Sequence, residues 1–119
     1  MKIILKGVPP SLNAFAGRQN PWEYRKAKAE WTDAVAWAVL AAGKPPVPYH
    51  KARITITYFF ATNARHDADN YAGKFLLDGL TKAGVIVDDD LKHITTTIKG
   101  EVDRKNPRTE IEVEEQHED

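Results

Sequence analysis

Four stretches of the chain alternate between hydrophobic and polar residues, which is the pattern of a half-buried β-strand. The longest is Arg53–Phe60, where Ile54, Ile56, Tyr58 and Phe60 fall on one face and threonines on the other. The other three stretches centre on Ile3 and Leu5, on Ile94–Ile98, and on Ile111–Val113. Asn106-Pro107 separates the last two strands with turn-forming residues, so the pattern predicts that they form a hairpin.

Two further segments carry hydrophobic residues at helical spacing. The first helix is predicted to begin at Pro21 or Trp22 and to end at Gly43. The second is predicted over Asp69–Ala83, with Leu76, Leu77 and Leu80 facing inward and Gly84 as its stop. The order β-α-β-α-β-β predicts an α/β (α+β) fold, a single domain over residues 1–119 with two helices packed on a small mixed sheet.

Composition narrows the classes of protein that remain. The chain has 119 residues, 42% of them hydrophobic, which is enough for one domain with a real core. It has no cysteine, so a disulfide scaffold, a thiolate metal site and a cysteine nucleophile are excluded. The longest apolar run, Ala34–Gly43, is about half the ~20 residues that a membrane span needs. These features predict a cytoplasmic protein with no membrane partner.

The formal net charge is zero, but the charges are unevenly distributed. Residues 1–66 hold 10 basic and 3 acidic side chains, whereas residues 67–119 hold 7 basic and 14 acidic ones. A basic half is typical of a protein with a polyanionic partner, although the two halves could equally neutralise each other across one fold. Arg18 and Arg25 are interleaved with Phe15, Trp22 and Tyr24, which could grip phosphates and stack bases or could form a core edge.

Acidic residues gather on both sides of the second predicted helix. Asp67 and Asp69 precede it, Lys74 lies in its first part, and Asp88-Asp89-Asp90 follows it. Carboxylates are ligands for Mg²⁺, and such an ion can activate water against a phosphodiester while a nearby ammonium holds the phosphate. The same residues could instead be a helix cap, an i,i+4 pair of Lys74 with Asp78, and a solvated turn.

The string containing these residues resembles the RusA family of Holliday-junction resolvases over the whole chain. The resemblance rests on Arg65-His66-Asp67-Ala68-Asp69-Asn70, on KFLLDGL at 74–80, on Thr81-Lys82-Ala83-Gly84 and on Val87-Asp88-Asp89-Asp90. Pro9-Pro10-Ser11 with Asn13 resembles the N-terminal motif of the family.

The resemblance implies a homodimeric, Mg²⁺-dependent endonuclease that resolves four-way junction DNA by paired nicking in DNA recombination and repair, with Mn²⁺ able to replace Mg²⁺. It implies that Asp67, Asp69 and Asp89 are the catalytic, metal-holding carboxylates and that Lys74 is the catalytic lysine. Arg65, His66 and Lys82, together with Arg18 and Arg25 of the basic half, are candidates for DNA contact. The competing hypotheses are a nuclease for other branched DNA, a catalytically impaired junction-binding protein, and a purely structural protein.

Three details depart from the family pattern or leave a choice open. Position 66 is His where the family often has Arg, and the third acid is chosen from three consecutive aspartates. Lys74 follows Asn70 by four residues instead of three. A regular helix from Asp69 would turn Lys74 away from the carboxylates, since five residues rotate a side chain by about 140°. The helix could begin later, near Tyr71, or carry a π-bulge at Ala72-Gly73, which is the favoured interpretation.

A dimer would present two matched sites to a junction of near two-fold symmetry. Ala34–Ala42 is apolar almost all round, more than packing on one sheet face requires. The first helix or the last strands are therefore predicted to contribute a self-association surface.

Overall fold

The computed structural model describes residues 1–11, 21–64, 66, 71 and 73–117. The elements are β1 (Lys2–Lys6), α1 (Pro21–Ala42), β2 (Ala52–Phe60), α2 (Lys74–Lys82), β3 (Ile94–Val102) and β4 (Arg108–Glu115). This order confirms the predicted β-α-β-α-β-β arrangement of two helices and a four-stranded mixed sheet. In the described part of the chain, neither helix is long and apolar enough to cross a membrane.

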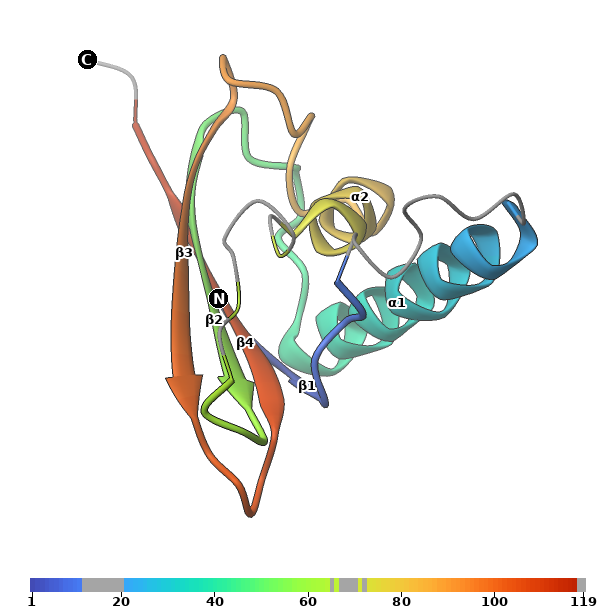
Figure 1. Ribbon diagram of the computed structural model, residues 1–119. Helices are drawn as coiled ribbons and strands as arrows, with labels where there is room; N and C mark the ends of the chain where they lie inside the picture. The colour runs from blue at the N-terminus through green and yellow to red at the C-terminus, as the bar shows by residue number, and fades with distance from the viewer. Residues whose placement is uncertain (12–20, 65, 67–70, 72, 118–119) are drawn as a thin grey trace.

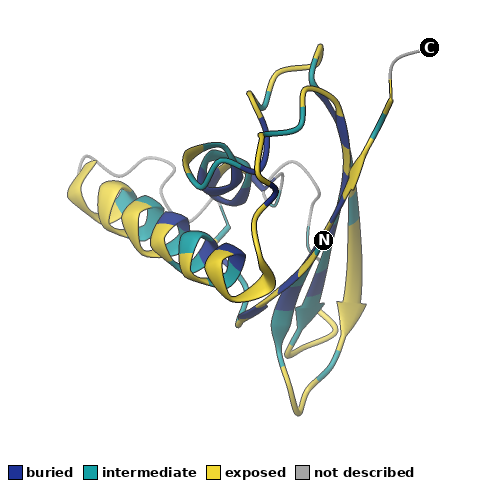
Figure 2. Ribbon diagram, turned by 180° about the vertical axis from the view of Figure 1, so that it is seen from behind, coloured by how far each residue is buried: buried dark blue, intermediate teal, exposed yellow. Residues whose placement is uncertain are grey.

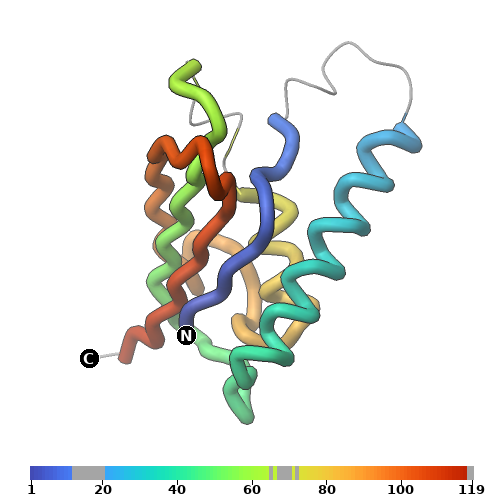
Figure 3. Tube along the Cα trace, turned by 90° about the horizontal axis from the view of Figure 1, so that it is seen from below, coloured from blue at the N-terminus to red at the C-terminus, as the bar shows by residue number. Residues whose placement is uncertain are grey.

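The strands lie in the order β1-β4-β2-β3. The strand β4 is antiparallel to both β1 and β2, whereas β3 is parallel to β2, with α2 in the connection between them. Both helices pack on the same face of the sheet, as Figures 1 and 3 show. The other face carries the charged residues of each strand.

The predicted hairpin between the last two strands is wrong. β2 lies between β3 and β4, and the connecting segment 103–107 crosses the end of β2, where Asp103 N donates a hydrogen bond of 2.9 Å to Phe60 O. Five extended residues span about 16 Å, which exceeds two strand spacings of about 4.8 Å each. A short turn is therefore compatible with crossing one strand as well as with a hairpin. Ile111 and Val113 are buried because they lie on the same face as Ile56 and Ile54 of β2, which the helices cover.

The core forms between the inner face of β2 and the two helices. Ile54, Ile56 and Tyr58 alternate inward from β2, as predicted, and are almost fully buried. Where the helices cross, Gly79 of α2 lies so close to Val35 of α1 that an added Cβ would be 2.8 Å from the valine Cβ. The small residue in KFLLDGL thus sets the distance between the helices.

The helix α2 begins later than predicted, at Lys74 instead of Asp69. Gly73 has a left-handed backbone (φ +83°) and its carbonyl accepts the hydrogen bond of 2.9 Å from Leu77 N. A residue with positive φ cannot belong to a continuous right-handed helix. The favoured π-bulge at Ala72-Gly73 is therefore wrong. The alternative prediction, a helix that begins later than Asp69, is correct, although α2 begins at Lys74 and not near Tyr71.

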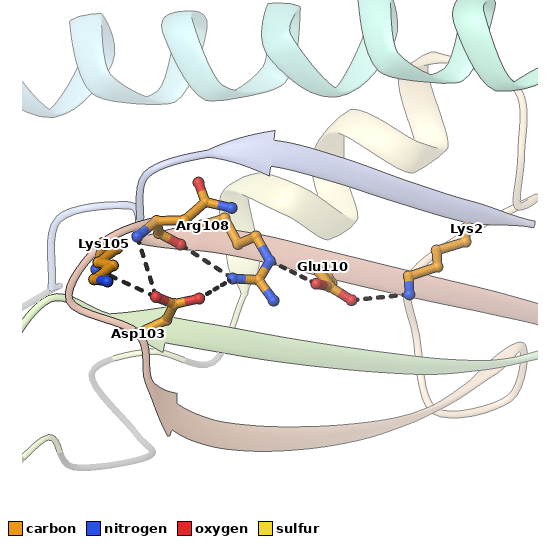
Figure 4. A network of polar contacts seen from close by, with 6 residues as sticks. Lys2, Asp103, Lys105, Arg108 and Glu110 are labelled. Atoms are coloured by element: carbon orange, nitrogen blue, oxygen red, sulfur yellow. Dashed lines mark hydrogen bonds and ion pairs between the residues drawn. The ribbon is translucent and has the colours of Figure 1, made fainter.

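The open face of the sheet carries a row of ion pairs that crosses β1 and β4 (Figure 4). Lys2 Nζ lies 3.0 Å from Glu110, Arg108 Nε lies 2.7 Å from the same carboxylate, and Arg108 Nη1 lies 2.7 Å from Asp103. The Arg108 guanidinium also lies 3.7 Å from the centroid of the Phe59 ring. Hydrogen bonds from Arg108 hold the pKa of Asp103 below its ordinary value; those from Lys2 and then Arg108 do the same for Glu110.

We expect this row to make the fold acid-sensitive. A carboxylate with a depressed pKa in the folded state stabilises the fold above its unfolded pKa and loses that contribution as pH falls through the folded pKa. Thermal unfolding from pH 7 to pH 3 should therefore show an Arg108→Met variant less stable than the unmutated protein at pH 7. The gap should narrow below about pH 4 as the carboxylates become protonated. If the difference in stability between the two proteins stays constant from pH 7 to pH 3, the ion pairs of Arg108 with Asp103 and Glu110 do not cause the acid sensitivity.

Candidate functional site

The amino end of α2 combines two features that favour an anion. The backbone N–H groups of a helix's first turn have no partners within the helix, and Gly73 offers no side-chain oxygen to cap them. Lys74, the first residue of α2, is exposed. A cation at this end opposes the helix dipole, so its position is unfavourable unless an anion binds there. A phosphate group would satisfy both the N–H groups and the ammonium.

Aromatic rings pack beside this helix end. The His66 ring stacks on Phe60 with centroids 3.7 Å apart and planes 5° apart. The Tyr71 ring meets Phe60 edge-on at 5.2 Å and Tyr58 at 5.6 Å. Burial raises the pKa of the Tyr58 hydroxyl far above its ordinary value, and the neighbouring Tyr71 raises it further. These contacts attach both flanks of the acidic segment 67–70 to the end of β2.

The chain after α2 turns back along the helix. Val85 N donates to Leu80 O at 3.0 Å, and Ile86 then forms a parallel bridge with Tyr49. Asp89 is half-buried beyond this bridge. Burial raises its pKa most, followed by a hydrogen bond with Asp88 and the negative charge of Asp78. Asp78, whose charge acts on Asp89, belongs to the middle of α2.

The neighbouring aspartates have different partners. Asp90 accepts hydrogen bonds from the backbone N–H groups of Lys92 and His93 and pairs with the His93 ring. Within the described residues, the only group of three potential metal ligands is Asp88, Asp90 and His93, whose ligand atoms lie within 4.8 Å of one another. No motif in the sequence assigns His93 to a site. Its position three residues after Asp90 in a turn was the available signal.

The helix α1 supports this part of α2. Tyr24 packs edge-on against Phe75 with ring centroids 5.3 Å apart, and Lys28 Nζ lies 3.5 Å from the Asp78 carboxylate. Asp78 therefore pairs with Lys28 from the other helix. Nothing in the sequence pattern places Lys28 near the site. The i,i+4 spacing of Tyr24 and Lys28 places both on the side of α1 that faces α2.

The other predicted site residues are dispersed. Lys82 is exposed at the carboxyl end of α2, about 12 Å along the axis from Lys74 at 1.5 Å per residue. Arg25 is exposed on the first turns of α1. Four predicted residues lie outside the described part of the chain: Arg18, Arg65, Asp67 and Asp69.

A family model described as endodeoxyribonuclease RusA matches residues 7–114, which is most of the chain. The chain belongs to the RusA endodeoxyribonuclease family. It is thus a Holliday junction resolvase of the RusA family, a hydrolase that acts on branched DNA. Nucleases of this family are metal-dependent. A search of curated proteins finds no match to the chain.

Proposed function

We propose that this RusA-family protein is a Mg²⁺-dependent, structure-selective endonuclease that cuts four-way junctions with Asp67, Asp69 and Asp89 as metal ligands. The assignment of Asp89 is supported by its half-buried place after α2, where burial, a hydrogen bond with Asp88 and the negative charge of Asp78 raise its pKa. A carboxylate held next to other negative charges is relieved by a divalent cation. Oxygen ligands from aspartates suit Mg²⁺, and Mn²⁺ accepts the same ligands.

The chain's own groups would bind and orient the phosphodiester. The Lys74 ammonium and the N–H groups of the first turn of α2 offer charge and hydrogen bonds to the scissile phosphate. Lys28 neutralises the charge of Asp78. Of the two acids Asp78 and Asp89, Asp89 is therefore the less neutralised. A divalent ion held by the aspartates would polarise the phosphodiester and make a water molecule more acidic. Hydrolysis would leave a 5′-phosphate and a 3′-hydroxyl.

Basic side chains beyond the reacting phosphate would hold the DNA arms. We assign this role to Arg65, His66 and Lys82, with Arg18 and Arg25 from the amino-terminal half. The separation of Lys82 from Lys74 along α2 is compatible with contacts to different phosphates. Because such contacts release counterions, junction affinity should fall steeply with added salt.

One incubation separates the proposed function from its competitors. A synthetic four-way junction is mixed with the protein in Mg²⁺ and, separately, in Ca²⁺. The nuclease binds in both ions and cuts only in Mg²⁺. An impaired junction-binding protein would shift the junction in both ions without cutting, and a structural protein would do neither. A nuclease for other branched DNA would cut flaps or forks faster than the junction.

We further propose that two copies associate through the outward face of α1. Trp37 and Leu40 lie three residues apart on this face and are 73% and 64% exposed. Figure 2 shows the exposed outer side of α1, opposite the stripe that packs on the domain. The open face of the sheet carries mainly charged residues, which favours α1 over the last strands as the self-association surface.

We expect light scattering to give a dimer at micromolar concentration and a monomer after the double change Trp37→Ser, Leu40→Gln. Ile4→Thr is the matched control, because Ile4 is 58% exposed on the open face of the sheet. The control should remain dimeric. A monomeric unmutated protein, or dissociation caused by Ile4→Thr alone, would contradict the assignment to α1.

A further inference from the structure

An aromatic slot lies at the carboxyl ends of β2 and β3, whose arrowheads point the same way in Figure 1. It consists of a hollow of about 470 Å³ and an adjoining space of about 100 Å³, and Phe60, His66 and Gly100 line both. Thr62, Asn63 and Glu101 line the larger hollow. Tyr58, Tyr71, Ile98 and Lys99 line the smaller space.

The slot remains open because position 100 has no side chain. Gly100 stands opposite Tyr58 in the sheet register, so a side chain there would point toward the aromatic rings. An added Cβ would lie 3.5 Å from Phe60 Cε2, which is an ordinary contact distance. The backbone at position 100 would therefore accept a residue with a Cβ without strain. A larger residue would simply fill the slot.

The chemistry of the lining suits a flat ring with polar edges. Aromatic side chains supply stacking surfaces, while the Thr62 and Asn63 side chains can donate and accept hydrogen bonds. Glu101 lines the larger hollow and its negative charge disfavours a phosphate there, whereas Lys99 lines only the smaller space. A nucleobase fits this combination of aromatic surfaces and hydrogen-bonding groups.

The slot adjoins the proposed cleavage site. His66 immediately precedes Asp67 in the chain. A Cβ built on Gly73, the residue before Lys74, would lie 3.5 Å from the Tyr58 hydroxyl and 4.0 Å from Ile98 Cδ1. Both of these side chains line the smaller space. A base in the slot would therefore be next to the helix end that is proposed to hold the scissile phosphate.

We propose that this slot binds one unpaired nucleobase displaced from the exchange point of the junction. The inference rests on the proposed function. A base bound in the slot is a contact that a fully paired duplex cannot make. Binding the displaced base would favour branched over linear DNA through stacking, which is independent of the contacts to phosphates.

Gly100→Val tests the proposal by filling the slot, and Thr97→Val is its matched control. Thr97 is exposed on the opposite face of the same strand, so this variant also places a valine on β3 but leaves the slot unfilled. Affinities are measured in Ca²⁺ for a four-way junction, for the same junction with abasic nucleotides at all four positions of the exchange point, and for a linear duplex. Thermal unfolding checks that both variants remain folded.

We expect Gly100→Val to bind the intact junction about 5- to 150-fold more weakly than Thr97→Val does, which is the range for losing one stacked base. On the abasic junction and on the duplex the two variants should bind equally. Equal affinity for the intact junction, or a loss of the same size on the abasic junction, would overturn the proposal. Cutting of the intact junction by the unmutated protein in Mg²⁺ tests the proposed function separately, so each can fail without the other.

Discussion

An Asp89→Asn variant should cut a four-way junction in Mg²⁺ on the order of 10²- to 10³-fold more slowly than the unmutated protein. Asparagine keeps the size of the side chain but removes the charge that would hold the cation. Because one negative charge is removed from a surface that faces phosphates, junction binding in Ca²⁺ should be retained or strengthened. Single-turnover cleavage and gel-shift titration measure the two effects independently.

The thermal stability of the same variant gives a readout that does not depend on cutting. A raised pKa means that folded Asp89 binds its proton more tightly than the unfolded residue does, so its ionised form disfavours folding at neutral pH. In the absence of metal at pH 7, Asp89→Asn should therefore unfold at a temperature equal to or above that of the unmutated protein. Added Mg²⁺ should stabilise the variant less than the unmutated protein.

Asp90→Asn is the matched control, because Asp90 is the neighbouring acid and its side chain is occupied by the turn that ends at His93. We expect this variant to cut at nearly the normal rate and to lose some thermal stability. If Asp90→Asn abolishes cutting while Asp89→Asn does not, the ligands come from the group of Asp88, Asp90 and His93, and the assignment of Asp89 is wrong.

A Gly73→Ala variant should lose about 2–5 kcal/mol of the free energy of unfolding. Part of the loss is the positive φ of +83°, which costs a residue with a Cβ about 1–2 kcal/mol. The rest is overpacking at about 1–3 kcal/mol, since the new Cβ would lie 2.6 Å from Ile56 Cδ1 in the core. Urea denaturation measures the loss.

Gly43→Ala separates the two causes. Gly43 also has a positive φ, +86°, but nothing lies within 4 Å of the Cβ it would gain. This variant should lose only the backbone contribution, about 1–2 kcal/mol. Equal losses in the two variants would show that the contact with Ile56 does not matter. In that case the packing of Gly73 would not explain why α2 begins at Lys74.

The order of the elements could be predicted because each element follows from local periodicity. Alternation identified β2 from Ile54, Ile56 and Tyr58, and the glycine at position 43 marked the end of α1. The pairing of strands depends on contacts between distant residues, which the alternation does not encode. Ile111 and Val113 are buried equally well beside β3 in a hairpin or between β1 and β2, so the sequence could not distinguish the two arrangements.

The start of α2 shows a similar limit. Asp69-Asn70 is a good capping pair, and the apolar spacing of Leu76, Leu77 and Leu80 is the same for an early or a late start. The decision depends on Gly73, whose backbone packs against Ile56 and Tyr58 from another element. For the site, the roles proposed for Lys74 and Asp89 come from the family motif. The pairing of Lys28 with Asp78 and of His93 with Asp90 required the structure.

The most direct test of the account uses a supercoiled plasmid that extrudes a cruciform. Two nicks made across one four-way junction convert such a plasmid to a linear molecule, whereas a single nick yields an open circle. We predict linear product in Mg²⁺, no product in Ca²⁺, and no cutting of the same plasmid after relaxation removes the cruciform. Open circles alone would contradict paired nicking, and equal cutting of the relaxed plasmid would contradict selectivity for junctions.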